Sequence, residues 1–485
     1  MKLRKHQSEG IQSLRESLAR GNKRPLLAAP CSYGKTLVAA TIMQAAAEKG
    51  KKSVFFCDRI KLLSQTVEAF DALGADYSVL QGDDPRYDPR KLIQIVSVQT
   101  AVRREHFIFD LAIVDECHQM YKGLIKIMER FDNIPFIGLS ATPYSKGLGK
   151  YYDDLIIPIT PRELIDQGYL CPTEYYVGKT INTKGLKTKA LATGGSDFDE
   201  SALGQAMIDD EVFNGDIVEN YIAHSGDKTK RAIAFSPSVS HSKSLVEKLN
   251  KAGVPALHID GYMPQEERKF IYDDHLAGRA LVLSCSRLLG VGFDDPGIEI
   301  LIDCFPCKSK INWIQRAGRI WRTAEGKEKA IYLDHAGNLQ RHGCFPEDVV
   351  PDNLDSGEKK FNEKNQTKRE EKEPIIRACP VCASAFTGRK CACGYQLGSE
   401  AAVLKDTGGL LKKAEKITVT DKSQFFGELA TYAKDKGYAD GWISHKYREK
   451  FGVWPQGIDR SRRPISLKTY GWIKSRQIAH AKARA

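Results

Sequence analysis

The architecture of the chain is indicated most clearly by residues 25–50, PLLAAPCSYGKTLVAATIMQAAAEKG. The opening letters, PLLAAP, are apolar enough for a buried strand, and the closing letters, TLVAATIMQAAAEKG, have the spacing and composition of a helix. Lys35 stands at the turn between them, after Gly34 and before Thr36. Backbone N–H groups at such a turn can surround phosphates while a hydroxyl holds Mg²⁺. These residues therefore predict a strand, a phosphate-binding loop and a helix in succession.

The loop departs from the general pattern at its first position, where Ala29 replaces glycine. An incidental Gly-Lys-Thr turn is therefore a second interpretation of the string. Under the first interpretation, the residues that bind the nucleotide are Ala29, Pro30, Cys31, Ser32, Tyr33, Gly34, Lys35 and Thr36. Thr36 is in addition the predicted protein ligand of Mg²⁺ in this loop.

Two acidic residues follow a second apolar run. The run FIFDLAIV, at residues 107–114, is typical of a fully buried parallel strand, and Asp115 and Glu116 come directly after it. Ligands gather at the carboxyl ends of strands in open α/β sheets. We predict that Asp115 holds Mg²⁺ through water and that Glu116 polarises the attacking water, as phosphoryl transfer requires. Two solvated acids at a strand end are the alternative, which the presence of Lys35 disfavours.

Short apolar runs divide most of the chain into two similar halves. In both halves the runs are rich in β-branched and aromatic residues and alternate with helical stretches, which predicts an α/β fold with a doubly wound parallel sheet in each half. Residues 145–228, between the halves, are expected to form an irregular connection followed by a helix. The runs lie at residues 53–58, 92–98, 111–116 and 135–141 in the first half and at 231–236, 256–260, 280–285, 299–304 and 329–335 in the second.

Four motifs carry a resemblance to a known family: GKT at 34–36, DECH at 115–118, SAT at 140–142 and QRAGRIWR at 315–322. They occur in the order shared by superfamily 2 helicases and translocases, whose fold is a pair of RecA-like lobes, and the resemblance covers about residues 1–340. DECH in place of DEAD makes the chain more similar to the helicase subunits of type III restriction enzymes and their phage-encoded relatives than to the DEAD-box RNA group. The opening LRKHQ, at residues 3–7, resembles the adenine-reading element LRxYQ of those restriction subunits.

The resemblance implies nucleotide contacts beyond the phosphate loop. Gln7 would contact the edge of the adenine base, although a surface glutamine on an N-terminal helix is the alternative interpretation. In the second lobe, the segment GVGFD at 290–294 resembles one that touches both nucleotide and nucleic acid, which makes Gly292 and Asp294 candidates. The residues expected to couple nucleotide state to strand binding are His118, Ser140 and Thr142.

QRAGRIWR implies that two arginines complete the site from the second lobe. Arg319 and Arg322 would reach across the cleft to the γ-phosphate, and Gln315 would bridge toward it. A planar guanidinium suits negative charge that spreads in the transition state, and arginine fingers contribute about 10³ to 10⁵ in rate in related systems. Arg316, beside them, is expected to be a surface charge and is not counted as catalytic.

Hydroxyl and amide side chains after several strands match the family's strand-contacting elements. Such groups suit phosphate contacts, which carry no sequence information, and each of them could instead be a helix cap or a turn residue. The strand-contacting elements that match begin at the ends of the first two apolar runs, with Asp58 and with Ser97. The residues predicted to contact nucleic acid here are Arg59, Gln65, Gln99, Thr100 and Ser286.

The overall composition is that of an ordinary globular protein, with 42% hydrophobic and 28% charged residues among 485. No apolar run approaches the roughly 20 residues that span a bilayer, and the N-terminus lacks a signal-peptide core. We therefore expect a cytoplasmic protein, in a bacterium or a phage-infected host, with reduced cysteines.

The predicted segments are a first RecA-like lobe at 1–150, a connecting segment at 151–228, a second lobe at 229–345, a charged linker at 346–374, a four-cysteine zinc-binding module at 375–397 and a basic, mainly helical domain at 398–485.

A compact cysteine cluster follows the charged linker. Cys379 and Cys382 form one close pair, and Cys391 and Cys393 form a second with CxC spacing, which departs from the commoner zinc-ribbon pattern. Two close thiolate pairs can complete a tetrahedral Zn²⁺ site, and a short segment poor in apolar residues needs a metal to fold. We predict a zinc-ribbon-like module. The pair Cys304/Cys307 in the second lobe is expected to be structural.

The last 85 residues carry most of the positive charge. Residues 401–485 hold 18 Lys and Arg against 8 Asp and Glu, a net charge of +10 out of +12 for the whole chain. Cations interleaved with aromatic rings suit phosphate attraction and stacking on unpaired bases. The alternative is a small helical domain with the aromatics as its core, and we favour such a core with a basic outer face. The candidate contacts are Trp442, Lys446, Trp454 and Trp472.

Together these features predict an enzyme that uses ATP, Mg²⁺ and Zn²⁺ and moves along DNA, single-stranded or branched, as a helicase or translocase. A motor that remodels RNA or nucleoprotein without separating strands is one alternative. A nucleic-acid-binding scaffold that ATP merely switches is another. No nuclease, methylase or primase signature accompanies the motor motifs.

Overall fold

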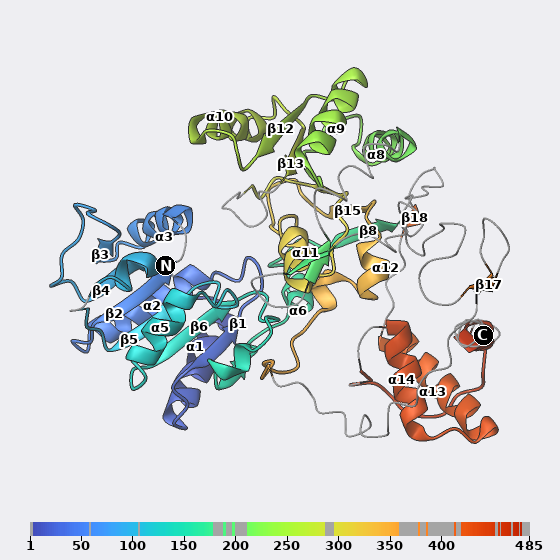
Figure 1. Ribbon diagram of the computed structural model, residues 1–485, viewed down its shortest axis with the longest axis horizontal. Helices are drawn as coiled ribbons and strands as arrows, with labels where there is room; N and C mark the ends of the chain where they lie inside the picture. Colours follow the sequence, from blue (N-terminus) through green and yellow to red (C-terminus); the bar gives the residue numbers. More distant parts are fainter. Residues whose placement is uncertain are drawn as a thin grey trace.

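The chain forms two α/β lobes and a small helical unit (Figure 1). No helix in the described part of the chain is long and apolar enough to cross a membrane. The computed structural model describes residues 3–57, 60–104, 107–177, 188–190, 196–198, 211–286, 295–357, 377–378, 385–386, 412–413, 419–451, 454–455, 457–466, 469–474 and 476–477.

The first lobe, blue to teal in Figure 1, is built on a seven-stranded sheet with strand order β3-β4-β2-β5-β6-β1-β7. Every neighbouring pair in it is parallel. Its central strands are mostly apolar and nearly all of their residues are buried, as expected for a parallel sheet covered on both faces. The strands are β1 (Pro25–Ala28), β2 (Ser53–Cys57), β3 (Tyr77–Leu80), β4 (Ile93–Ser97), β5 (Leu111–Val114), β6 (Phe136–Ser140) and β7 (Asp154–Ile156).

Helices cover the two faces of this sheet. In the N-terminal helix, buried residues recur at positions 7, 10, 11 and 14, the spacing that turns one helical face toward a sheet. The helical elements of the first lobe are α1 (Lys5–Ala19), α2 (Lys35–Ala47), α3 (Ile60–Ala72), α4 (Val98–Ala101), α5 (Lys122–Arg130) and the 3₁₀ turn η1 (Leu148–Lys150).

The second lobe, green to orange in Figure 1, has strand order β12-β13-β11-β14-β15-β8-β18. Its pairs are parallel except β8 with β18, which is antiparallel. The strands are β8 (Thr173–Val177), β11 (Ala232–Phe235), β12 (Ala256–Asp260), β13 (Val282–Ser286), β14 (Ile300–Asp303), β15 (Ala330–Asp334) and β18 (Lys412–Lys413). Its helical elements are α8 (Glu211–His224), α9 (Val239–Lys251), α10 (Gln265–Leu276), α11 (Lys310–Ala317), α12 (Asn338–His342) and the 3₁₀ turn η2 (Pro346–Asp348).

The range predicted as an irregular connection contributes to both sheets. Strand β7 pairs with β1 in the first lobe, and β8 pairs with β15 in the second. Between them lies α6 (Pro161–Asp166), which begins with a capping box formed by Thr160 and Glu163. A hairpin of β9 (Thr188–Ala190) and β10 (Ser196–Phe198) follows β8. The strands β7 and β8 are short and are stabilised by pairing with distant segments, so the sequence of this range alone does not predict them.

The start of the predicted charged linker is packed, because residues 346–357 run from the second lobe back to the first. The buried carboxylate of Glu347 accepts a hydrogen bond from the hydroxyl of Tyr175 and lies 3.3 Å from Arg162. Further on, Asp355 accepts a hydrogen bond from the backbone N–H of Gly147, at 3.0 Å through its side chain. The two lobes are therefore joined by this return segment as well as by α6.

Arg316 is buried, so its interpretation as a surface charge is wrong. Only 1% of the residue is exposed, and its guanidinium donates to the carboxylate of Asp303 at 2.7 Å and to the carbonyl oxygen of Phe305 at 2.8 Å. Burial lowers the pKa of Arg316, but Asp303 and the other groups around the guanidinium together outweigh burial, so the pKa is raised. The guanidinium also lies against the Sγ of Cys307, which fits the structural role predicted for that cysteine.

A helical unit near the C-terminus has a core of its own. It contains α13 (Val419–Lys436) and α14 (Asp440–Phe451), which pack against each other (Figure 1). The buried residues of its core are Phe425, Phe426, Leu429, Ala430, Tyr432, Ala433, Ile443, Tyr447, Phe451 and Ile473. The aromatic residues of this stretch thus include core residues, as the second interpretation of the tail expects.

Removing the guanidinium of Arg316 should leave a buried carboxylate without its counter-ion. We expect Arg316→Ala to lower the free energy of unfolding by about 3–5 kcal/mol, the usual result of breaking a buried pair. Urea denaturation followed by tryptophan fluorescence measures this. The control is Arg279→Ala, which removes an exposed pair with Asp274 and should cost at most about 1 kcal/mol. Equal stability of the two variants would contradict the structural role of Arg316.

Candidate nucleotide site between the lobes

Three of the motifs meet at one edge of the first lobe's sheet. Strands β5, β6 and β1 are consecutive neighbours in the sheet, and each ends directly before a motif or in it. The backbone N–H of Ala29 donates to the carbonyl oxygen of Ser140 at 2.9 Å, and that of Cys117 donates to Leu139 at 3.0 Å. The phosphate loop, DECH and SAT are therefore side by side at the carboxyl ends of parallel strands, where α/β proteins bind ligands.

The phosphate loop has the backbone shape that its glycine permits. Gly34 caps α2 with φ +90°, a left-handed conformation, and a Cβ there would lie 2.5 Å from Nε2 of Gln7. Ser32 is also left-handed, with φ 64°, and its buried Oγ has no hydrogen-bond partner among the described residues. The positive end of α2 and its free N–H groups point at this loop. The arrangement fits a phosphate group.

Gln7 is buried, so the alternative of a surface glutamine is wrong. It is 3% exposed, donates from Nε2 to the carbonyl oxygen of Tyr33 at 2.7 Å and accepts from the backbone N–H of Arg4 at 2.8 Å. The hydroxyl of Tyr33 in turn donates to the carbonyl oxygen of His6 at 2.9 Å. These bonds fasten the phosphate loop to α1. Contact of Gln7 with adenine stays a prediction.

A lysine and two carboxylates face one another across the site. Nζ of Lys35 lies 2.9 Å from Oε1 of Glu116. Burial lowers the pKa of Lys35, but Glu116 and Asp115 outweigh it and the pKa is raised. Burial raises the pKa of Asp115, whereas the pKa of Glu116 is lowered because the nearby positive charges, Lys35 foremost, together outweigh its burial. The site therefore favours an ionised Glu116, the form that can accept a proton from water.

A chain of polar contacts runs from Glu116 to the second lobe. Nδ1 of His118 lies 3.2 Å from Oε2 of Glu116 and 2.9 Å from Oγ of Ser140. The backbone N–H of Thr142 donates to Ser140 Oγ at 3.0 Å. On the other side, Nε2 of Gln315 lies 3.5 Å from Nε2 of His118 and donates to Oγ1 of Thr142 at 3.4 Å. Because Gln315 belongs to α11, these contacts join the two lobes.

His118 is a neutral group in this chain of contacts. Burial lowers its pKa to about 4 despite the nearby Glu116. A carboxylate beside Nδ1 favours the tautomer that carries its proton there, which leaves Nε2 to accept a hydrogen bond from the amide of Gln315. Gln315, predicted to bridge toward the γ-phosphate, lies next to His118 and Thr142.

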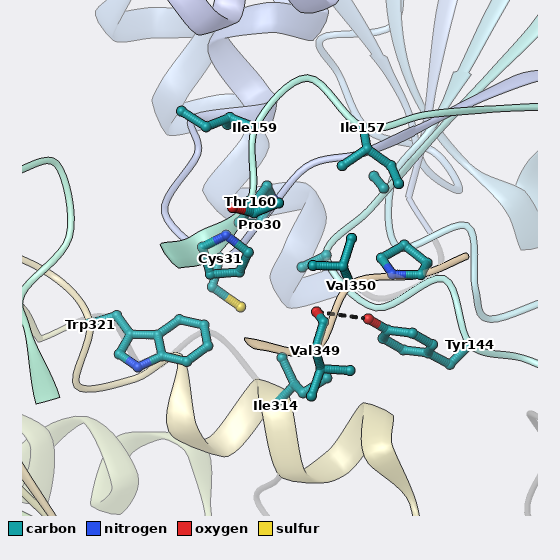
Figure 2. A pocket seen from close by; sticks show the side chains of 14 residues that line it. Pro30, Cys31, Tyr144, Ile157, Ile159, Thr160, Ile314, Trp321, Val349 and Val350 are labelled. Atoms are coloured by element: carbon teal, nitrogen blue, oxygen red, sulfur yellow. Dashed lines mark hydrogen bonds between the residues drawn. The ribbon is translucent and has the colours of Figure 1, made fainter. Parts of the chain in front are cut away.

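The phosphate loop also touches the second lobe directly. A Cβ added to Gly318 would lie 2.7 Å from Sγ of Cys31, so only glycine allows this approach. Figure 2 shows Cys31 facing Trp321 and Ile314 of the second lobe around a small cavity of about 20 Å³. Tyr144 closes another side, where its hydroxyl donates to the carbonyl oxygen of Val349 at 3.1 Å. The lobes are thus in contact behind the phosphate loop.

Both predicted finger arginines come from the segment that follows this contact. Burial raises the pKa of the Cys31 thiol, and Lys35, Arg319 and Arg322 act in the opposite direction. Arg319 also helps to lower the pKa of Glu116. Both arginines therefore act electrostatically on the phosphate loop from the second lobe.

Several predicted residues are not brought to this site. The hydroxyl of Thr100 accepts a hydrogen bond from the backbone N–H of Gly82 at 3.0 Å, as its turn interpretation expects, and Gln99 beside it is exposed. Ser97 and Ser286 are buried at the ends of β4 and β13. The predicted residues outside the described part of the chain are Asp58, Arg59, Gly292, Asp294, Cys379, Cys382, Cys391 and Cys393, together with the side chain of Gln65.

The tail tryptophans have different surroundings. The ring of Trp442 lies nearly parallel to that of Tyr432, with centroids 5.8 Å apart, and Trp472 meets Phe425 edge-on at 5.2 Å. Trp454 is 39% exposed, with the guanidinium of Arg448 at 4.6 Å from its ring. Nζ of Lys446 is 2.5 Å from Glu449. Trp454 is the most accessible of the three.

Two contributors to this site escape the sequence analysis. The sequence predicts a surface charge for Arg316 and no role for Gly318, although both residues belong to QRAGRIWR. A glycine immediately before a predicted finger is a signal for close approach of another backbone or side chain. No local signal identifies Asp303 as the partner of Arg316, because the two are thirteen residues apart and meet through sheet packing.

The two lobes match known helicase families. Residues 1–145 match the family model of the type III restriction enzyme res subunit, and residues 215–324 match the helicase conserved C-terminal domain. The chain belongs to the superfamily 2 helicases, in the type III restriction-like group, and is an ATP-hydrolysing enzyme.

Individual relatives agree with this assignment. The "51.5 kDa protein" of a Lactococcus phage is 28% identical over 388 residues, 77% of this chain and 78% of that protein. "Putative ATP-dependent helicase IRC3" of Saccharomyces cerevisiae is 25% identical over 360 residues, which are 69% of this chain but only 51% of the yeast protein. The type ISP restriction-modification enzyme LlaBIII shares the fold, with a TM-score of 0.52 and 18% identity over 69% of this chain and 27% of that enzyme.

Helicase domains use ATP and Mg²⁺, and the residues present fit both. The left-handed loop at Gly34 and the ammonium of Lys35 suit the phosphates, and the side chains of Thr36 and Asp115 offer the oxygen ligands that Mg²⁺ prefers.

Glu116 is the group best suited to accept a proton from the attacking water. We expect Glu116→Gln to lower kcat of ATP hydrolysis by about 10²–10⁴, because the amide cannot act as a base. ATP binding should be retained, which a fluorescent-nucleotide titration measures alongside a phosphate-release assay. The control is Glu129→Gln, a change at an exposed residue on α5. Normal turnover by the Glu116 variant would remove this residue from the catalytic set.

Proposed function

We propose that this chain is an ATP-dependent DNA translocase that unwinds or remodels DNA, with hydrolysis coupled to closure of the two lobes. The observation that carries the proposal is the chain of contacts from Glu116 through His118 to Gln315. The residue proposed to activate water is thereby linked to the other lobe through a single imidazole. A change at the nucleotide can then alter how the lobes meet, which is what a stepping motor needs.

The chemical roles that we propose are divided between the lobes. From the first lobe, Lys35 neutralises phosphate charge and Glu116 accepts the proton of the attacking water. From the second lobe, Arg319 and Arg322 stabilise charge that develops in the transition state. Bound ATP would supply the phosphoryl group that is transferred, with Mg²⁺ held by Thr36 and Asp115.

The nucleic acid would bind along the strand-end loops of both lobes. Hydroxyl and amide groups there favour the phosphate backbone over the bases, so binding to DNA would not depend on sequence. LlaBIII, which shares the fold, was solved bound to DNA. The residues proposed for these contacts are Arg59, Gln65, Gln99 and Thr100, with Gly292 and Asp294 contacting both nucleic acid and nucleotide. Ser286 is buried and is not among them.

We propose that the basic tail is an accessory DNA-binding domain. Trp454 is its best candidate for stacking on an unpaired base, since its ring is exposed and carries a cation over one face. Trp442 and Trp472 are partly buried against the core and would contribute through one edge. Lys446 would add to phosphate attraction.

The proposed motor should respond to nucleic acid. We expect single-stranded DNA to raise the ATPase rate several-fold above the rate without nucleic acid, and forked or tailed duplexes to be separated in a strand-displacement assay. Stimulation by RNA alone would favour the RNA-remodelling alternative. Stimulation by DNA without displacement would favour translocation without unwinding. No stimulation by any nucleic acid would leave only the scaffold that ATP switches.

We also propose that Cys379, Cys382, Cys391 and Cys393 bind one Zn²⁺. Mass spectrometry of the intact protein under native conditions should then find a single zinc ion per chain, and Cys382→Ala should lose it because three thiolates bind zinc far more weakly. Cys344→Ala, which changes a half-buried cysteine of the second lobe, is the matched control and should keep the metal. A wild-type chain that purifies and folds without zinc would refute the site.

A further inference from the structure

Lys327 is a buried lysine just downstream of QRAGRIWR. Only 8% of it is exposed, yet no carboxylate in the described part of the chain accepts a hydrogen bond from it. Its Nζ donates instead to three backbone carbonyl oxygens, those of Pro296 at 3.1 Å, Ile320 at 2.9 Å and Arg322 at 2.8 Å. An ammonium group has three N–H donors, so all of them are used within the protein.

These bonds fix the backbone that carries the predicted finger. The carbonyl oxygens of Ile320 and Arg322 bond to Lys327, and the carbonyl oxygen of Trp321 between them accepts from the backbone N–H of Cys171 at 2.7 Å. Three consecutive carbonyl groups are thus held by hydrogen bonds within the second lobe. The third bond of Lys327 reaches Pro296, two residues after Asp294 in the other predicted nucleotide-facing segment.

We propose that Lys327 is a positioning residue for ATP hydrolysis, which holds the backbone of residues 320–322 so that the guanidinium of Arg322 faces the phosphate loop. The inference rests on the proposed finger role of Arg322. The hydrogen bonds of Lys327 all go to backbone carbonyl groups, so it would act through Arg322 and not on the nucleotide. A misplacement of about 1 Å at a reacting group can lower the rate by roughly 10². Loss of the hydrogen bonds that fix this backbone should therefore lower the rate of ATP hydrolysis.

The surroundings of Lys327 make this hold sensitive to pH. Burial lowers its pKa to about 8; Cys171, Glu299 and Asp295 act to raise it, and Arg231 to lower it. Asp295 is largely compensated by Arg231, whose guanidinium lies 2.6 Å from it. Above pH 8 the neutral amine retains two N–H donors for three carbonyl groups. One of the three bonds is then lost, and the backbone is held less firmly.

The test compares kcat and KM for ATP in Lys327→Met, Arg322→Ala and the double variant, with Lys329→Met as the matched control. Lys329 lies two residues away, is exposed and pairs at the surface with Glu174. We expect Lys327→Met to lower kcat by roughly 10 to 10² with little change in KM, since its role is to position a group that acts in the transition state. The control should behave as wild type. In the Arg322→Ala background, Lys327→Met should add almost nothing, because both changes act through one guanidinium.

The outcomes separate the two hypotheses. If Arg322→Ala leaves kcat unchanged, the finger role is wrong and the role of Lys327 is overturned with it. If Arg322→Ala lowers kcat but Lys327→Met does not, or if the two effects multiply in the double variant, the finger role stands and the positioning role of Lys327 is overturned.

The pH dependence of kcat is a second test. It needs no substitution of Lys327, so it can be made even if Lys327→Met does not fold. Wild-type kcat should fall as pH rises through about 8, because the ammonium loses its proton there. Arg322→Ala should lack this fall, since it has no guanidinium left to misplace. The same fall in wild type and in Arg322→Ala would overturn the proposal.

Discussion

The buried ion pair between Arg316 and Asp303 sets the geometry of the second lobe where it meets the nucleotide site. Asp303 ends β14, and its carboxylate also accepts hydrogen bonds from Tyr332 and from Asn338. Arg316 lies on α11, which therefore cannot rotate without breaking a charge pair that is shielded from water. Gln315 is the preceding residue on that helix, and its direction toward the first lobe follows from the same constraint.

The first lobe obeys a different constraint. Parallel strands end at a common edge, so motifs that are about 80 residues apart in the chain, such as those containing Lys35 and Glu116, come within 2.9 Å of each other. The pairing of these charges inside the protein is stronger than it would be in water. His118 contacts both Glu116 of the first lobe and Gln315 of the second. The position of its imidazole therefore depends on the sheet of the first lobe and on the ion pair that fixes α11. In the proposed motor, contacts of this length would couple the nucleotide to the second lobe without any long-range rearrangement.

The segment from α11 to β15 carries the proposed finger arginines, and its backbone is held at several points. An arginine has several rotatable bonds, so its charge is useful in catalysis only where its backbone is fixed. Here Gly318 lies against the phosphate loop, and the carbonyl groups at 320–322 are bonded to Lys327 and Cys171. The burial of Lys327 is costly unless every donor is satisfied, and the three carbonyl oxygens meet that condition.

Local sequence was enough to specify the alternation of strands and helices, the two-lobed α/β fold and the order of the motifs, because apolar periodicity and a phosphate-loop glycine are local properties. It could not specify that Gln7 braces the loop, that Arg316 is buried, or that β7 and β8 belong to different sheets. Each of these depends on a partner in another element of the fold: Tyr33, Asp303, and the strands β1 and β15. Burial and pairing of polar groups follow from which segments pack together, and that is a property of the tertiary structure alone.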